Sequence, residues 1–175
     1  MTKPSRPSKP DEASYCPRTY FVTTRTAGGR SLFQTERMTS LFVEVLRSNM
    51  RARRFTIHDF VVMPDHVHIL MTVPGGMSIE KAMQLTKGGF SFRAKRELGF
   101  QGEIWQRGFS DARVSDDVNF QQHRNYIENN PVKSGLSRTA DEYLLGSAFL
   151  KKQKHAGAEA QTSSSTSCGT TEVVP

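Results

Sequence analysis

The segment at residues 54–73 reads RFTIHDFVVMPDHVHILMTV. It is rich in β-branched and aromatic residues, which favour strands, and a Met-Pro-Asp tripeptide interrupts it once. Proline cannot donate to a strand ladder and aspartate favours turns, so the segment predicts two strands, at 54–62 and 66–73, joined by a short turn. Because side chains alternate between the two faces of a strand, we expect His66 and His68 on one face and the intervening valine on the other.

Weaker patterns on both sides of this segment extend the prediction. Strands are expected at about 18–26 and 104–114, and helices at about 35–50, 78–97 and 116–130. The order β-α-β-β-α-β-α is that of a split β-α-β unit with one added helix. The sequence therefore predicts an α+β fold of the ferredoxin-like or RRM-like type. Its antiparallel sheet has about four strands backed by helices, and an extra C-terminal helix carries Tyr126.

The helix predicted at 116–130 has an unusual polar face. Two aspartates suit its N-terminus, and Pro131 is expected to stop it. Tyr126 and Asn130 are four residues apart and therefore share one face, with His123 one turn earlier. An isolated helix tyrosine is usually half-buried with its hydroxyl in water, so this face gains meaning only beside the two histidines.

The histidine pair is a candidate metal site. Two neutral imidazoles one pleat apart can bind a single divalent cation, although an isolated His-x-His pair is more often structural. The amide oxygen of Asn130 is a reasonable third ligand, and the carboxylate of Glu128 is an alternative one. Magnesium prefers oxygen ligands and manganese accepts imidazole more readily, so Mg²⁺ and Mn²⁺ are both candidates.

Together these motifs resemble a known family. His66-Val67-His68, followed by Tyr126-Ile127 and Asn130-Pro131-Val132, resembles the single-tyrosine HUH transposases, in which U is a hydrophobic residue. More narrowly, the sequence resembles the REP-associated tyrosine transposases of bacteria over about residues 18–150. This resemblance implies metal-dependent nicking of single-stranded DNA and strand transfer through a 5′-phosphotyrosine intermediate. The implied substrate is hairpin-forming repetitive extragenic palindromic DNA.

The resemblance also implies roles for individual residues. Tyr126 would be the nucleophile, and the divalent cation would be held by His66, His68 and Asn130. His123 and Glu128 are candidate accessory residues, since each lies within one turn of Tyr126 on the predicted helix. Whether the tyrosine serves the histidines of its own chain or of a partner is left open, as is the choice between a monomer and a homodimer.

Charge favours a polyanionic partner. The chain has 175 residues, a net charge of +7 and a sequence pI of about 9.7. With a candidate nuclease site present, the basic clusters favour single-stranded or hairpin DNA. Candidate DNA-contacting residues are Arg25, Lys87, Arg93, Lys95, Arg96, Trp105, Arg107, Arg113 and Lys133. For Trp105, packing in the core is the more common alternative.

Composition along the chain predicts one domain with two tails. Residues 1–17 are proline-rich and polar and are expected to be disordered or loosely docked, and residues 151–175 read as a basic stretch followed by a Ser/Thr-rich tail. The domain between them is expected at 18–150. With two cysteines, no signal-peptide pattern and no apolar stretch of about 20 residues, we expect a bacterial cytoplasmic, nucleoid-associated protein without a membrane span.

Two other functions compete with the enzyme. A basic, sheet-based protein could bind single-stranded or hairpin nucleic acid without cleaving it. A histidine-triad nucleotide hydrolase also carries His-x-His on a strand, but its third alternating histidine would fall at position 70, which is Leu70.

Overall fold

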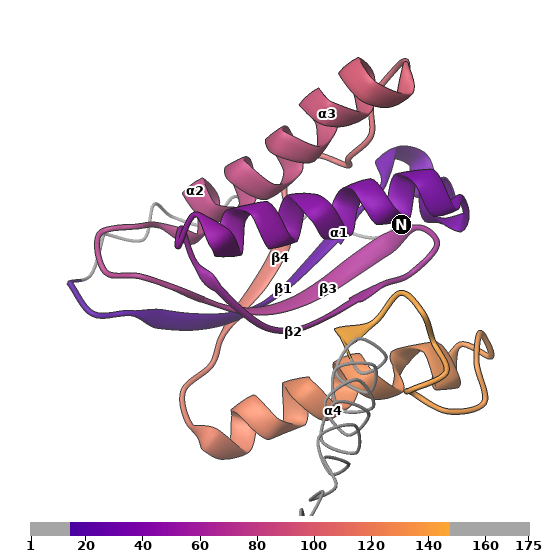
Figure 1. Ribbon diagram of the computed structural model, residues 1–175. Helices are drawn as coiled ribbons and strands as arrows, with labels where there is room; N and C mark the ends of the chain where they lie inside the picture. The colour runs from indigo at the N-terminus through magenta and orange to yellow at the C-terminus, as the bar shows by residue number, and fades with distance from the viewer. Residues whose placement is uncertain (1–14, 148–175) are drawn as a thin grey trace, which may run out of the picture.

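The computed structural model describes residues 15–147, which form one antiparallel sheet with helices on both faces (Figure 1). The strands are β1 (Arg18–Arg25), β2 (Thr56–Val62), β3 (His66–Val73) and β4 (Ser110–Arg113), in the spatial order β2-β3-β1-β4. The helices are α1 (Glu36–Arg51), α2 (Ile79–Met83), α3 (Gly89–Leu98) and α4 (Asp117–Lys133). The predicted α+β fold with a four-stranded antiparallel sheet is confirmed.

Short helical turns complete the described chain. Two 3₁₀ turns, Ala27–Gly29 and Leu32–Gln34, connect β1 to α1, and a π-helical turn, Gln84–Gly88, joins α2 to α3. The expected tails at 1–17 and 151–175 lie outside the described residues, apart from residues 15–17. Within 15–147, no helix has the length and apolar character needed to cross a membrane.

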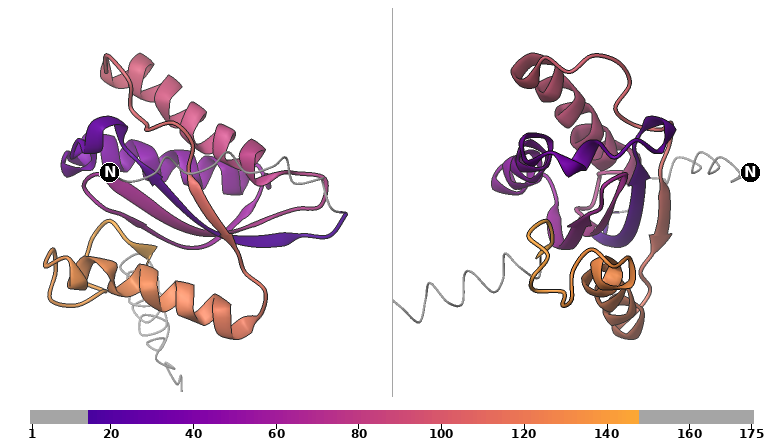
Figure 2. Two further views of the ribbon diagram at one scale, coloured as in Figure 1. Left: turned by 180° about the vertical axis from the view of Figure 1, so that it is seen from behind. Right: turned by 90° about the vertical axis from the view of Figure 1, so that its right-hand side faces the viewer.

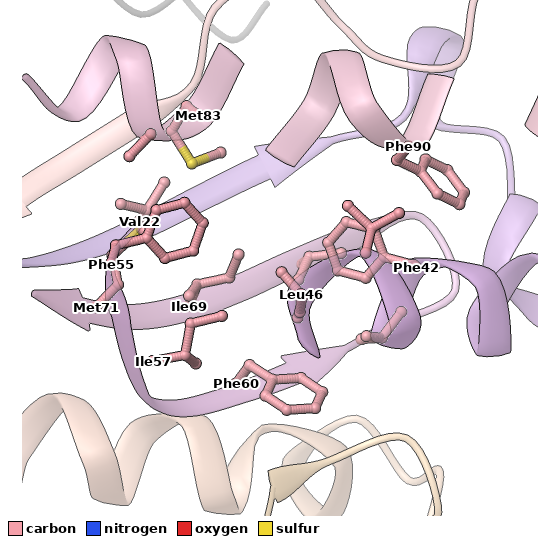
Figure 3. Packing of buried hydrophobic residues seen from close by; sticks show 14 of the residues in the cluster. Val22, Phe42, Leu46, Phe55, Ile57, Phe60, Ile69, Met71, Met83 and Phe90 are labelled. Carbon is pink, nitrogen blue, oxygen red and sulfur yellow. The ribbon is translucent and has the colours of Figure 1, made fainter. Parts of the chain in front are cut away.

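The main core lies between the sheet and the helices α1, α2 and α3 (Figure 3). Every second residue of β3 from Val67 onward points into it, as strand alternation predicts. Helix α1 contributes Phe42 and Leu46, and α3 contributes Phe90, all of which are almost fully buried. This core anchors one face of the sheet and leaves the opposite face free to carry the site.

Helix α4 covers that opposite face (Figure 2). Helix α4 packs on this face through a second, smaller hydrophobic cluster of Val61, Met63, Leu70 and Ile127. Since Leu70 belongs to this cluster and side chains two apart share a face, His66 and His68 also project toward the α4 side. The fold therefore brings the histidine strand and the tyrosine helix face to face.

Two predicted boundaries are wrong. The strand expected at 104–114 is shortened to Ser110–Arg113, because the chain makes only an isolated bridge at Trp105 and then turns through Gly108, whose φ is +73°. Helix α4 continues past Pro131 to Lys133. A proline removes one helical hydrogen bond, and so near the C-terminus the last half-turn can persist.

Candidate active site

The two histidine rings lie close together on β3. Their centroids are 4.8 Å apart and the ring planes are nearly perpendicular. Nδ1 of His66 lies 2.6 Å from Oδ1 of Asp65, and Nδ1 of His68 lies 2.8 Å from Oγ1 of Thr23. Each ring is therefore oriented through Nδ1, which leaves both Nε2 atoms to face another group.

His68 is held in its neutral form. Burial, with smaller contributions from His66 and Arg25, lowers the pKa of His68 to about 3. Its Nε2 is buried and has no hydrogen-bond partner among the residues that the structure describes. A neutral, oriented imidazole with an unsatisfied buried nitrogen suits a metal ligand, because a cation would supply the missing partner.

Tyr126 lies against this histidine pair in the same chain. Its ring meets the His68 ring edge-on at a centroid distance of 5.2 Å and also contacts Phe21 edge-on at 5.7 Å. The side chain remains 42 % exposed, so the phenol borders solvent. Phe21 stacks on His68 at 5.4 Å and on His123 at 4.4 Å, which places His123 one ring away from the pair.

The contacts of α4 indicate where Asn130 lies. Phe120 meets His58, which lies near the start of β2 and is hydrogen-bonded to Thr72 near the end of β3, and Tyr126 meets His68, so α4 runs antiparallel to β3. Four helical residues rise about 6 Å and two strand residues about 6.6 Å. One turn beyond Tyr126, the buried Asn130 is therefore at the level of His66.

Glu128 lies on a different side of α4. Arg124 reaches Oδ2 of the buried Asp59 at 3.3 Å and Oε1 of Glu128 at 3.6 Å. Because Asp59 lies on β2, this ion pair draws Glu128 toward β2. Of the two candidate oxygen ligands, Asn130 shares the helix face of Tyr126 and Glu128 does not.

The donor set fits a divalent cation. Two imidazole Nε2 atoms and one amide oxygen form a mixed nitrogen and oxygen set, which Mn²⁺ accepts readily and Mg²⁺ less so. No cluster of three or more His, Cys, Asp or Glu side chains suited to a metal occurs within residues 15–147.

A cleft of about 760 Å³ opens beside Tyr126 and His68. Arg25 and Arg107 line it together with the backbone of Gly28 and Gly29. Three of the predicted DNA-contacting side chains therefore lie at the site: Arg25, Arg107 and Lys133, whose Nζ lies 5.9 Å from the centre of the Tyr126 ring. Phosphate groups are a natural ligand for such a surface.

The other predicted DNA-contacting residues are not among those that line the cleft. On α3, across the sheet from Tyr126, Arg93 forms ion pairs with Glu44 and Glu97, which raise its pKa. The same helix carries the exposed Lys95 and Arg96, and Arg96 lies over the ring of Phe92.

Arg113, on the edge strand β4, is opposite the core residue Tyr20 and so faces away from α4. Trp105 packs in the main core against Phe33, Phe42 and Phe90. Lys87 reaches the backbone of the segment that borders the cleft.

Sequence reasoning missed the residues that orient the site. Thr23, Phe21 and Asp65 each contact a histidine ring, and Arg124 ties α4 to Asp59. Asp65 had a detectable signal, because it directly precedes the His-x-His motif. Thr23 had none, since its pairing with His68 depends on the register between β1 and β3.

Comparison with known proteins identifies the family of this chain. The family model "Transposase IS200 like" matches residues 18–130, more than half of the chain. The chain therefore belongs to the IS200-like transposase family.

Two curated relatives have a narrower description, REP-associated tyrosine transposase. A Haemophilus influenzae protein assigned to this group is 32 % identical over 96 residues, which are 49 % of this chain and 54 % of that protein. The Escherichia coli K12 protein is 27 % identical over 126 residues, which are 71 % of this chain and 73 % of that one. The chain thus spans about half the length of the first relative and about three quarters of the second.

A solved structure shares the fold. It is a REP-associated tyrosine transposase bound to a REP hairpin, and it superposes with a TM-score of 0.60 at 23 % sequence identity. The alignment covers 83 % of this chain and 82 % of that one. At this level of identity the likeness establishes the fold alone.

Proposed function

We propose that this protein nicks single-stranded DNA and transfers the cut strand, using a divalent metal ion and Tyr126 as the nucleophile. One observation carries the proposal: the Tyr126 ring lies 5.2 Å from that of His68, whose buried Nε2 lacks a partner among the described residues, at the edge of a basic cleft. A phenol, an oriented imidazole pair and a phosphate-binding surface are the groups that such a reaction needs.

The reaction conserves bond energy. The phenol oxygen of Tyr126 attacks the scissile phosphorus and loses its proton to solvent or a base. The bond from phosphorus to the 3′ oxygen breaks, and that oxygen takes up a proton from solvent or the same base. The products are a 5′-phosphotyrosine and a free 3′-hydroxyl. A 3′-hydroxyl can later attack the phosphotyrosine and restore a phosphodiester, which joins strands without ATP.

The protein side chains supply positioning and charge. His66, His68 and Asn130 would hold a divalent cation, which when bound polarises the phosphate and offsets its developing charge. Arg25 and Arg107 line the path of the strand, where they can bind the neighbouring phosphates. Phe21 contacts the rings of both His68 and Tyr126, so it helps to fix the phenol relative to the imidazole.

We further propose that the substrate is a hairpin of the REP type and that one chain forms a complete site. The names of the two curated relatives and the hairpin bound in the solved structure support the first point. The contact between Tyr126 and His68 of one chain supports the second. A DNA substrate would place the protein at the bacterial nucleoid.

The test is covalent capture of a labelled single-stranded hairpin in the presence of Mn²⁺. Tyr126→Phe should abolish the adduct on denaturing gels. Hairpin affinity should stay within about twofold, because phosphate contacts provide most of the affinity for DNA. Tyr15→Phe, at a fully exposed tyrosine, is the matched control and should form the adduct normally. Mass mapping should locate the DNA on the peptide that contains Tyr126.

Two results would count against the enzyme. An adduct that persists in Tyr126→Phe would exclude this tyrosine as the nucleophile. Hairpin binding without an adduct in the wild-type protein, under Mn²⁺ and Mg²⁺ alike, would favour the non-catalytic nucleic-acid binder. EDTA added before the DNA should prevent formation of the adduct and leave hairpin binding intact, as expected if the cation acts in the chemical step.

A further inference from the structure

We propose that Lys87 is a positioning residue that fixes the wall of the cleft beside Tyr126 and thereby sets the affinity for the DNA strand lying there. This inference rests on the proposed function, because it assumes that the cleft holds DNA. The wall in question is the segment from Gln106 to Gly108, all three residues of which line the cleft.

The ammonium group of Lys87 spans this segment. Nζ donates to the carbonyl oxygen of Gln106 at 2.9 Å and to that of Gly108 at 2.5 Å. These two carbonyls flank Arg107, so Lys87 fixes the backbone on both sides of that arginine. Two charge-assisted hydrogen bonds to one short loop restrict it strongly.

A third hydrogen bond runs in the opposite direction. The indole Nε1 of Trp105 donates to the carbonyl oxygen of Lys87 at 3.1 Å. The Trp105 ring is itself fixed, because it packs between Phe33, Phe42 and Phe90 of the main core. The core therefore fixes Trp105, Trp105 fixes the backbone of Lys87, and the ammonium of Lys87 fixes the cleft segment.

The local helix geometry agrees with this role. Lys87 lies in the π-helical turn Gln84–Gly88, and such turns occur frequently at functional sites because they change the direction of one side chain. Burial lowers the pKa of Lys87 to about 8, so most molecules keep the charge at neutral pH. A half-buried ammonium is costly unless hydrogen bonds compensate it, and the two carbonyls do so.

The hydrogen bonds of Lys87 hold Arg107 at the wall of the cleft. Arg107 is exposed in the cleft, and its guanidinium has no ion-pair or hydrogen-bond partner among the residues that the structure describes. The segment is also joined to β1, since the backbone N–H of Gln106 donates to the carbonyl oxygen of Arg25 at 2.9 Å. Lys87 thus fixes the backbone that presents Arg107 to the cleft, which Arg25 and Tyr126 also line.

The experiment compares the full-length wild type with Lys87→Met, Lys87→Arg and the control Lys81→Met. Lys81 is an exposed lysine on α2, and its ammonium donates to the side-chain oxygen of Gln84 at 3.1 Å. Two quantities are measured on folded protein: the rate of tryptic cleavage after Arg107, followed by mass spectrometry, and the dependence of adduct formation on hairpin concentration.

We expect Lys87→Met to accelerate cleavage after Arg107 selectively and to raise the half-saturating hairpin concentration by about tenfold, the equivalent of one charge-assisted hydrogen bond. The rate at saturating DNA should change less than about twofold, because Lys87 does not touch the reacting atoms. Lys87→Arg should restore part of both properties, and Lys81→Met should match the wild type.

Equal cleavage after Arg107 in Lys87→Met and the wild type would overturn the inference, whatever the activity. So would a loss of rate at saturation with unchanged half-saturation. If Lys87→Met does not fold, Lys87→Gln, which is shorter and uncharged, provides the same comparison. A wild type that binds the hairpin without forming an adduct would overturn the proposed function alone, and proteolysis with hairpin affinity would still decide the role of Lys87.

Discussion

At the scale of single residues, His68 carries the strongest physical signature of the site. It is a buried imidazole between Thr23 and Tyr126, and its environment opposes protonation. In the folded protein the His68 imidazole resists protonation, whereas in the unfolded chain it takes up a proton at its ordinary pKa. The stability of the metal-free protein should therefore depend on pH partly through His68.

The folded pKa of His68, about 3, lies below its unfolded value of 6.5, so the unfolded state binds more protons between these pH values. Stability should then be fully present above 6.5 and decline as the pH falls toward 3. Between about pH 7.5 and pH 5 the wild type should lose about 2 kcal/mol more than His68→Gln. Urea unfolding in EDTA measures this difference, and parallel pH profiles for the two proteins would contradict it.

The sequence was informative about this residue and silent about its neighbours. Strand alternation predicted that His66 and His68 share a face, and helix periodicity predicted that Tyr126 and Asn130 share another. Those rules concern residues close in the chain. The approach of Thr23 and Phe21 to His68 depends on strand register and on stacking between elements, which local periodicity does not contain.

At the scale of elements, α4 determines whether the site exists. Arg124 connects it to the buried Asp59 of β2, and Oγ of Ser147 also donates to Asp59 at 2.9 Å. The phenol of Tyr143 donates to the carbonyl oxygen of Val62 at 2.8 Å. The segment that follows α4 therefore returns to β2 and holds the tyrosine helix against the sheet.

Removing the guanidinium should loosen this attachment. Arg124→Met removes the guanidinium beside the buried carboxylate of Asp59, and we expect a loss of about 1–3 kcal/mol in the free energy of unfolding. Asp59→Asn combined with Arg124→Met should recover part of that loss, because the carboxylate charge is then also removed. Chemical denaturation of the two single variants and the double variant measures the coupling, and strictly additive effects would show that the ion pair does not stabilise the helix position.

Element boundaries were less predictable than element order. The composition of 104–114 favours a strand, yet the chain enters the sheet only at Ser110 because Trp105 is drawn into the core and Gly108 turns the backbone. The helix expected at about 78–97 is divided into α2, a π-helical turn and α3, and Lys87 in that turn accepts a hydrogen bond from Trp105, which lies far away in the sequence. Tertiary contacts overrode local preference in both places.

At the scale of the whole molecule, the question that sequence left open is whether one chain builds the site alone. The described chain brings Tyr126 to its own His68, and the attachment of α4 to β2 involves residues of the same chain. Under the proposed function, one chain would supply both groups of its own site. It follows that two inactive variants with different defects should not rescue one another.

The test mixes Tyr126→Phe, which keeps the histidines, with His68→Ala, which keeps the tyrosine. Because each chain must supply both groups to its own site, the mixture should form no more adduct with the labelled hairpin than either variant alone. Mixing each variant with wild-type protein controls for inhibition, since the wild-type adduct should persist. If α4 instead crossed to a partner, the histidines of one chain would serve the tyrosine of the other. Adduct would then appear on the His68→Ala chain, and its mass would identify it.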